Sequence, residues 1–234
     1  MGALVRKEFT VYFKNPTGWF TLCVYTLIAG VCFVFSVINN NTTSMYTFFS
    51  LYLYIANLVF VSLLSFKFFS EEKKNGTDKL WTTSPVSLYT VVLSKFVSAF
   101  CLFFFGSLVN ILYALILGMF GDFDVSTFVV QYIGVLLLGA AMISVAVFIS
   151  TFTEHQISTV AAVFGTLLFM YIIGAVSKYL PSWLGSALES ISLYSRYGDF
   201  ALGILSLAPV VFYVSITAVF LFLSVRMLEK RRWE

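Results

Sequence analysis

Charged residues are what this sequence has least of. Asp, Glu, Lys and Arg make up 11% of its 234 residues, whereas soluble domains carry about 25%. No charged residue occurs from position 15 to 66 or from position 96 to 121. Hydrophobic residues account for 60% of the chain, and the mean hydropathy is +0.95. A water-soluble core cannot hide so much apolar surface at this length, so the sequence indicates a membrane protein.

Histidine and cysteine are also scarce. The chain has one His and three Cys, and all three cysteines (Cys23, Cys32 and Cys101) fall inside apolar stretches. This pattern predicts neither a disulfide framework nor a metal site, and we expect no cofactor on this chain. No carboxylate pair, Ser/His arrangement or metal set is apparent, which argues against an enzyme. The basic residues lie near expected membrane boundaries, which argues against a nucleic-acid partner.

Six apolar blocks are each close to the ~20 residues that cross the hydrocarbon of a bilayer. We therefore expect an all-α membrane protein with six transmembrane helices. The predicted spans are 17–38, 46–67, 91–118, 127–150, 157–176 and 209–227.

Residues 2–15 precede the first span. Leu4, Val5 and Phe9 recur there at helical spacing, with charged residues between them. This pattern predicts an amphipathic helix lying in the membrane interface, and a plain cytoplasmic leader is the alternative. The segment does not resemble a cleavable signal peptide, so we expect the first span to remain in the mature protein.

The distribution of Lys and Arg predicts the orientation. With six crossings and both termini in the cytoplasm, only Lys178 and Arg196 of the fourteen basic residues fall outside. The other twelve lie on the inner side: Arg6, Lys7, Lys14, Lys67, Lys73, Lys74, Lys79, Lys95, Arg226, Lys230, Arg231 and Arg232.

Residues 177–208, on the outer side, are too many for a turn and too apolar for a free loop. Ser182 is placed to cap a helix after Pro181. We predict two short re-entrant helices, 183–189 and 198–207, separated by 192–197, which dip into the bilayer where protein covers their ends.

Residues 67–95, the polar segment, interrupt the apolar pattern between the second and third spans. Gly76 allows a tight turn, and Thr77 or Asp78 can cap a short helix over 78–83. On that helix Leu80 and Trp81 form an apolar anchor of the kind found at interface hot spots. Glu71, Glu72, Lys73 and Lys74 provide charges for pairing, and Pro85 ends the run. The polar segment thus predicts a surface that another protein grips; an ordinary solvated loop is the alternative.

Several other polar residues are candidates for function. Glu154 and the single histidine, His155, lie at a predicted cytoplasmic helix end. They are candidates for a gate or a second partner contact, with helix-end polarity as the alternative; acid–base catalysis would need further groups. Asn57, Asn110 and Gln131 fall inside predicted spans. Such amides either bond neighbouring helices or line a substrate path.

The polar segment, the N-terminal helix and the outer segment together resemble the ABC-2 family of transporter permeases. The motifs that carry this resemblance are Glu71-Glu72-Lys73-Lys74-Asn75-Gly76-Thr77, Leu80, Ser84-Pro85-Val86-Ser87 with Lys95, Arg6-Lys7-Glu8-Phe9 with Lys14-Asn15-Pro16, and Tyr194 to Gly203. The resemblance covers essentially the whole chain, 1–234, as one transmembrane domain. The chain is similar to short subunits without a large outer domain, such as gliding-motility and bacteriocin-immunity permeases.

The resemblance implies a multi-pass permease of the inner or plasma membrane. Two six-helix subunits, identical or paralogous, would pair, and separate ATPase subunits would bind ATP and Mg. Residues 68–90 would form the cytoplasmic coupling region, with Glu71, Glu72, Gly76, Thr77, Leu80, Trp81 and Pro85 as its coupling residues. The chain itself has no G-x-x-x-x-G-K-[ST] phosphate loop.

The function expected from this resemblance is ATP-driven export. The substrate would be amphiphilic, peptide or lipid-like, and a partner ATPase would supply the energy. The alternative is a membrane scaffold, or a motility or assembly subunit, driven by an ABC ATPase without classical export.

Overall fold

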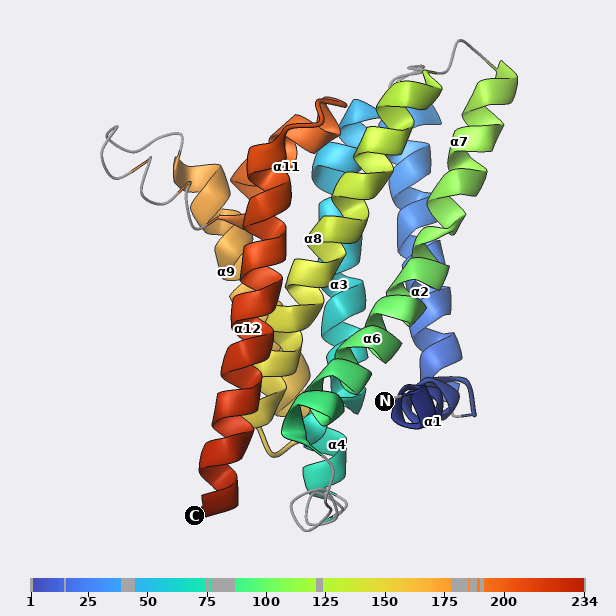
Figure 1. The fold of residues 1–234 in the computed structure, drawn as a ribbon. Helices are drawn as coiled ribbons and strands as arrows, with labels where there is room; N and C mark the ends of the chain where they lie inside the picture. Colours follow the sequence, from blue (N-terminus) through green and yellow to red (C-terminus); the bar gives the residue numbers. More distant parts are fainter. Residues whose placement is uncertain are drawn as a thin grey trace.

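The computed structural model describes residues 2–14, 16–38, 45–74, 76, 87–120, 124–177, 185, 189 and 192–233. Within these ranges the ordered elements are all helical (Figure 1). In chain order they are α1 (Gly2–Lys14), α2 (Pro16–Phe33), η1 (Val34–Ile38), η2 (Phe48–Tyr52), α3 (Leu53–Leu64), η3 (Ser65–Lys67), α4 (Phe69–Lys74), α6 (Leu88–Ser107), α7 (Val109–Phe120), α8 (Val125–Phe152), α9 (Gln156–Val176), α11 (Leu193–Ala201) and α12 (Leu207–Trp233).

Six helical stretches in the described residues are long and apolar enough to cross a membrane, which confirms the predicted number. The second is longer than expected, because η3 and α4 extend it to Lys74. The six are Pro16–Val37, Phe48–Lys74, Leu88–Met119, Val125–Phe152, Gln156–Val176 and Leu207–Lys230.

Helix α8 forms the centre of the bundle. It packs against α3, α6, α9, α11 and α12, and α12 runs beside it along most of its length (Figure 1). Two glycines permit this close packing. A Cβ on Gly139 would collide with the ring of Phe103 in α6, and one on Gly134 would collide with Phe200 in α11. Helix α8 can therefore lie close to both α6 and α11.

Capping side chains set where the central helices begin. Asp124 accepts hydrogen bonds from the Ser126 amide (3.0 Å) and the Thr127 hydroxyl (2.5 Å) at the start of α8. These bonds, first that from Thr127 and then those from Ser126, lower the pKa of Asp124 to about 2. The carboxylate is therefore charged at the positive end of the helix dipole.

Helix α1 lies across the direction of the spans at one end of the bundle (Figure 1). It packs on α6 and α2, and the Ser98 hydroxyl of α6 donates to the Val5 carbonyl at 3.2 Å. The indole of Trp19 donates to the Phe13 carbonyl at 3.1 Å, across the turn into α2. Helix α1, helix α4 and the C-terminal end of α12 lie at the same end of the bundle (Figure 1), as expected for an even number of crossings. The interfacial position of α1 stays a prediction.

The helices expected within residues 177–208 differ from their predicted boundaries. The predicted helix over 183–189 lies largely outside the described residues. The predicted helix over 198–207 is wrong, because α11 begins at Leu193 and ends at Ala201. Ser192 starts it by accepting a hydrogen bond from the Ser195 amide at 3.3 Å, and Gly203 follows its end at φ +78°. Gly in this left-handed conformation is a common helix terminator. Insertion of α11 into the bilayer stays a prediction.

Candidate functional site: where α1, α4, α6 and α8 meet

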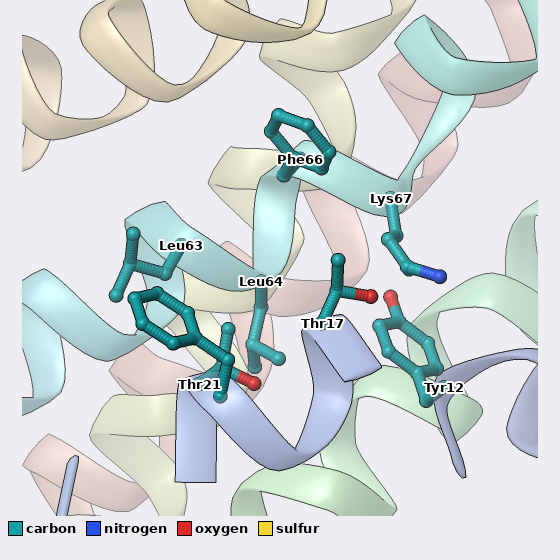
Figure 2. A pocket seen from close by; sticks show the side chains of 8 residues that line it. Tyr12, Thr17, Thr21, Leu63, Leu64, Phe66 and Lys67 are labelled. Carbon is teal, nitrogen blue, oxygen red and sulfur yellow. The ribbon is translucent and has the colours of Figure 1, made fainter. Parts of the chain in front are cut away.

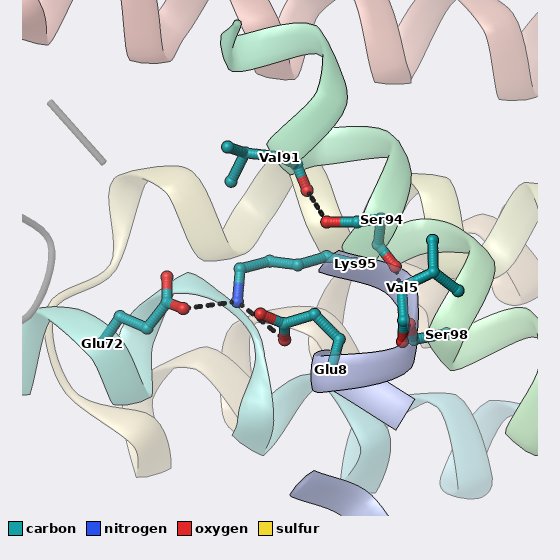
Figure 3. Close-up of polar contacts among 7 residues, drawn as sticks. All are labelled: Val5, Glu8, Glu72, Val91, Ser94, Lys95 and Ser98. Atoms are coloured by element: carbon teal, nitrogen blue, oxygen red, sulfur yellow. Dashed lines mark hydrogen bonds and ion pairs between the residues drawn. The ribbon is translucent and has the colours of Figure 1, made fainter. Parts of the chain in front are cut away.

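Three charged residues from distant parts of the chain meet where α1, α4 and α6 converge (Figure 3). The Lys95 ammonium group of α6 lies 2.9 Å from Glu72 Oε1 of α4 and 3.3 Å from Glu8 Oε2 of α1. Lys95 is only 3% exposed, and its ammonium group also lies 5.1 Å from the centre of the Phe69 ring. We call Glu8, Glu72 and Lys95 the ion triad.

The ion triad corrects one feature of the sequence interpretation. The polar segment was expected to present its charges on a surface, but Lys67 and Lys95 at its two ends are buried in helices. Glu72 also pairs inside the chain, whereas Glu71 and Lys73 are part-buried and Lys74 is exposed. Removing one partner of a buried ion pair strongly destabilises a protein, because the other charge is left unpaired. The ion triad therefore holds α4 against α1 and α6.

Lys73, the next residue, connects α4 to the end of α8. Its ammonium group donates to the carbonyls of Thr151 (2.6 Å), Thr153 (2.9 Å) and Ser150 (3.3 Å). These carbonyls end α8, where the helix has no intrahelical donors left and the dipole favours a cation. Helix α4 is thus bonded on one side to α1 and α6 and on the other to α8.

The described residues stop shortly after this point. Gly76 has φ +65°, and its amide donates to the Lys73 carbonyl at 3.1 Å. This is the tight turn expected of Gly76, and it ends α4. Ser87 starts α6 by accepting from the Thr90 amide at 3.4 Å. The candidate coupling residues between them lie outside the described residues: Thr77, Leu80, Trp81 and Pro85.

Glu154 and His155 lie in the short turn between α8 and α9. Both are exposed. The turn is stabilised by its neighbours: the Thr153 and Thr159 hydroxyls lie 2.6 Å apart, and the Thr159 amide donates to the His155 carbonyl at 3.0 Å. Because the Lys73 ammonium group also donates to the Thr153 carbonyl, this turn is hydrogen-bonded directly to α4. Two exposed polar residues on it are available to a partner.

The three intramembrane amides differ in how well they are satisfied. Asn110 donates to the Tyr25 phenol at 3.1 Å, and Gln131 donates to the Ala201 carbonyl at 2.8 Å. Both bonds join neighbouring helices. Asn57 in α3 is fully buried, yet neither of its amide atoms has a hydrogen-bond partner among the described residues. A buried polar group left unsatisfied calls for a water or ligand that completes it.

Sequence reasoning missed the pairing of Glu8 with Lys95. A signal was present, because Glu8 is the only acidic residue before position 71 and Lys95 begins a long run without charge. An ionisable residue at the edge of a span requires a partner. The periodicity of neither helix identifies that partner, since 87 positions separate the two residues.

The chain matches the profile of a known membrane-protein family along almost its full length. The match covers residues 3–229, and the family is described as ABC-2 family transporter protein. No curated protein sequence matches the chain. The match includes the ion triad, the polar segment and the six spans except the last residue of the sixth, and it confirms the resemblance drawn from the motifs. The chain therefore belongs to the ABC-2 family of transporter membrane proteins.

Proposed function

We propose that this chain is the permease subunit of an ATP-driven ABC exporter, and that its partner ATPase docks on the coupling region 68–90. The observation that carries the proposal is the position of α4 at the start of that region. Glu72 pairs with Lys95, and Lys73 binds the end of α8. A partner that displaces the region would therefore move α1, α6 and α8 together. A solvated loop would need no such connections.

The proposed coupling begins at Leu80 and Trp81, which supply the apolar anchor for the ATPase. Binding of ATP and Mg to the partner moves this anchor, and the ion triad and the Lys73 contacts pass the movement to the spans. The exposed turn with Glu154 and His155 serves as a second ATPase contact. Tightly packed cores transmit such shifts because they have discrete arrangements rather than a continuous range.

The proposed substrate is amphiphilic, peptide or lipid-like, and it moves outward. The unsatisfied amide of Asn57 in a core span supports a path along α3, because a passing polar group would complete its hydrogen bonds. Asn110 and Gln131 border that path while they also bond neighbouring helices. A second permease copy or a paralogue completes the transporter.

The test uses liposomes that contain the permease and its partner ATPase. Leu80→Asp or Trp81→Ala is expected to separate ATP hydrolysis from transport, while the permease still inserts and folds. Leu80→Met and Trp81→Phe are the matched controls, because each keeps a large apolar side chain at its position, and both should leave ATP hydrolysis coupled to transport. Normal coupling in both Leu80→Asp and Trp81→Ala would contradict the docking site. An ATPase activity that no amphiphile or peptide stimulates would favour the scaffold function instead.

A further inference from the structure

A cavity of about 250 Å³ lies between the turn from α1 into α2 and the end of α3 (Figure 2). Leu63, Leu64 and Phe66 form much of its apolar wall, and Lys67, Tyr12 and Thr17 contribute its polar groups. Figure 2 shows the ammonium group of Lys67, the phenol of Tyr12 and the hydroxyl of Thr17 pointing toward one another. The open wall of the cavity is almost wholly apolar, and these polar groups lie buried at one end of it.

Lys67 is the unusual residue of this cavity. It is 7% exposed, and its ammonium group has no hydrogen-bond partner among the described residues. The charge of Glu71 acts on Lys67, but among the described residues the two groups do not form an ion pair within 4 Å. The buried hydroxyl of Thr17 also lacks a partner. Burying an unpaired charge costs free energy. A ligand that enters the cavity and forms hydrogen bonds with these two groups would offset that cost.

The polar groups suit an anion. Lys67 supplies a positive charge, and Thr17 supplies a hydroxyl that can donate. Burial raises the pKa of the Tyr12 phenol well above its ordinary value, so at neutral pH it is a neutral donor. Charge-assisted hydrogen bonds from such donors to a phosphate or carboxylate are short and strong. No described residue that lines the cavity carries a negative charge, although Glu8, Glu71 and Glu72 are close enough to raise the pKa of Tyr12 further.

The apolar wall suits a hydrocarbon chain. Phe20 also lines the cavity and is 62% exposed on the outside of α2. In a membrane-spanning helix such a face meets lipid, so the cavity borders the bilayer. Its volume lies just under the ~300 Å³ at which pockets for whole ligands begin. It has room for a head-group anion and the first part of one chain.

We propose that this cavity binds an anionic membrane lipid, with its phosphate on Lys67, Thr17 and Tyr12 and the start of one acyl chain against Leu63, Leu64 and Phe66. The bound lipid would fix the turn between α1 and α2 to the end of α3. This inference does not depend on the proposed function, because it needs neither an ATPase nor a transported substrate.

The experiment measures lipid retained by the purified, delipidated chain. Palmitoyl-oleoyl phosphatidylglycerol or the corresponding phosphatidylcholine is titrated in detergent micelles, and native mass spectrometry counts the bound lipid. We expect one phosphatidylglycerol to bind in preference to phosphatidylcholine. Lys67→Gln should weaken that binding by roughly tenfold or more, which corresponds to one charge-assisted contact. Thr17→Val keeps the shape and removes one donor, so it should weaken binding by a smaller factor.

Lys74→Gln is the matched control. It removes the same charge seven positions further on, from an exposed residue that does not line the cavity. It should leave the tight phosphatidylglycerol site unchanged, whereas a general attraction of lipid to basic residues would weaken in both variants. Glycerol 3-phosphate, which has no chain, should not displace the lipid, and full displacement would overturn the role of the apolar wall. Equal binding of the two lipids, or unchanged binding in both Lys67→Gln and Thr17→Val, would overturn the site.

Discussion

Two buried lysines stand at opposite ends of the polar segment, and their surroundings differ completely. Lys95 is 3% exposed and Lys67 is 7% exposed. Lys95 lies between two carboxylates and against the ring of Phe69. Lys67 has no hydrogen-bond partner among the described residues and faces a cavity. At similar burial, Lys95 thus joins helices through ion pairs, whereas Lys67 is placed to bind the proposed lipid.

The difference shows that burial of a charge does not by itself identify its role. A buried charge whose hydrogen bonds and ion pairs are complete stabilises the fold. Removing it leaves its partners unpaired in an apolar environment. A buried charge without partners makes no bond that its removal would break. The two lysines should therefore respond in opposite ways to the same substitution, and four changes test or refine this contrast.

The largest expected effect is that of Lys95→Met. The change leaves Glu8 and Glu72 facing each other without their cation, and breaking a buried pair costs about 3–5 kcal/mol. The free energy of unfolding in detergent micelles titrated with sodium dodecyl sulfate should fall by this amount. Protease sensitivity of α1 should rise as well, because Glu8 is its ionic contact to α6.

A combined variant sharpens this prediction. In Glu8→Gln/Glu72→Gln/Lys95→Met none of the three positions of the ion triad carries a charge, so much of the lost stability should return. Equal stability of Lys95→Met and the wild-type chain would contradict a structural role for the ion triad. A triple variant as unstable as Lys95→Met would mean that packing, rather than charge, accounts for the loss.

The second effect concerns the end of α8. Lys73→Met removes the donor to three carbonyls, and we expect a loss of about 1–2 kcal/mol, because the site is only part-buried. Hydrogen exchange at Thr153 and the following turn should accelerate. Lys74→Met, at the exposed neighbouring position, is the control and should change neither quantity. Unaltered exchange in Lys73→Met would show that α4 does not hold this turn.

The sequence predicted the number and approximate position of the spans because the signal is local. About 20 consecutive apolar residues suffice to indicate a crossing, and the six observed spans overlap the six predicted ones. The end of the second span was harder to predict from the sequence. Its extension through η3 and α4 to Lys74 contains charges, and charges are normally read as the end of a span.

The site could be predicted only in part, because its geometry depends on distant contacts. Gly76 was recognised as a turn from its type alone, and the structure has it at φ +65°. The pairing of Glu8 with Lys95 joins positions far apart in sequence, so no window of residues contains it. Helix α11 begins earlier than predicted because Ser192, rather than a residue near 198, caps it. Ser190, Ser192 and Ser195 can all cap a helix by residue type, so propensity alone does not choose between them.

The third effect concerns the end of α4. Gly76→Ala places a side chain at φ +65°, and a left-handed residue other than Gly costs about 1 kcal/mol. Among the described residues no atom lies within 4 Å of the added Cβ, so the cost expected there is conformational rather than steric. Gly165→Ala in α9 is the matched control. It also meets open space but has ordinary helical geometry, and it should not destabilise the chain. Equal effects of the two changes in the same titration would contradict this assignment.

The smallest expected effect completes the contrast between the two lysines. Lys67→Met removes a buried cation that bonds to no described residue, so in lipid-free micelles the free energy of unfolding should stay within about 0.5 kcal/mol of the wild-type value or rise slightly. In micelles with phosphatidylglycerol the order should reverse, because only the wild-type chain gains stability from bound anionic lipid. A large loss in lipid-free micelles, similar to that of Lys95→Met, would mean that Lys67 also has a structural partner. Retention of the lipid-dependent gain in Lys67→Met would mean that the lipid acts elsewhere on the chain.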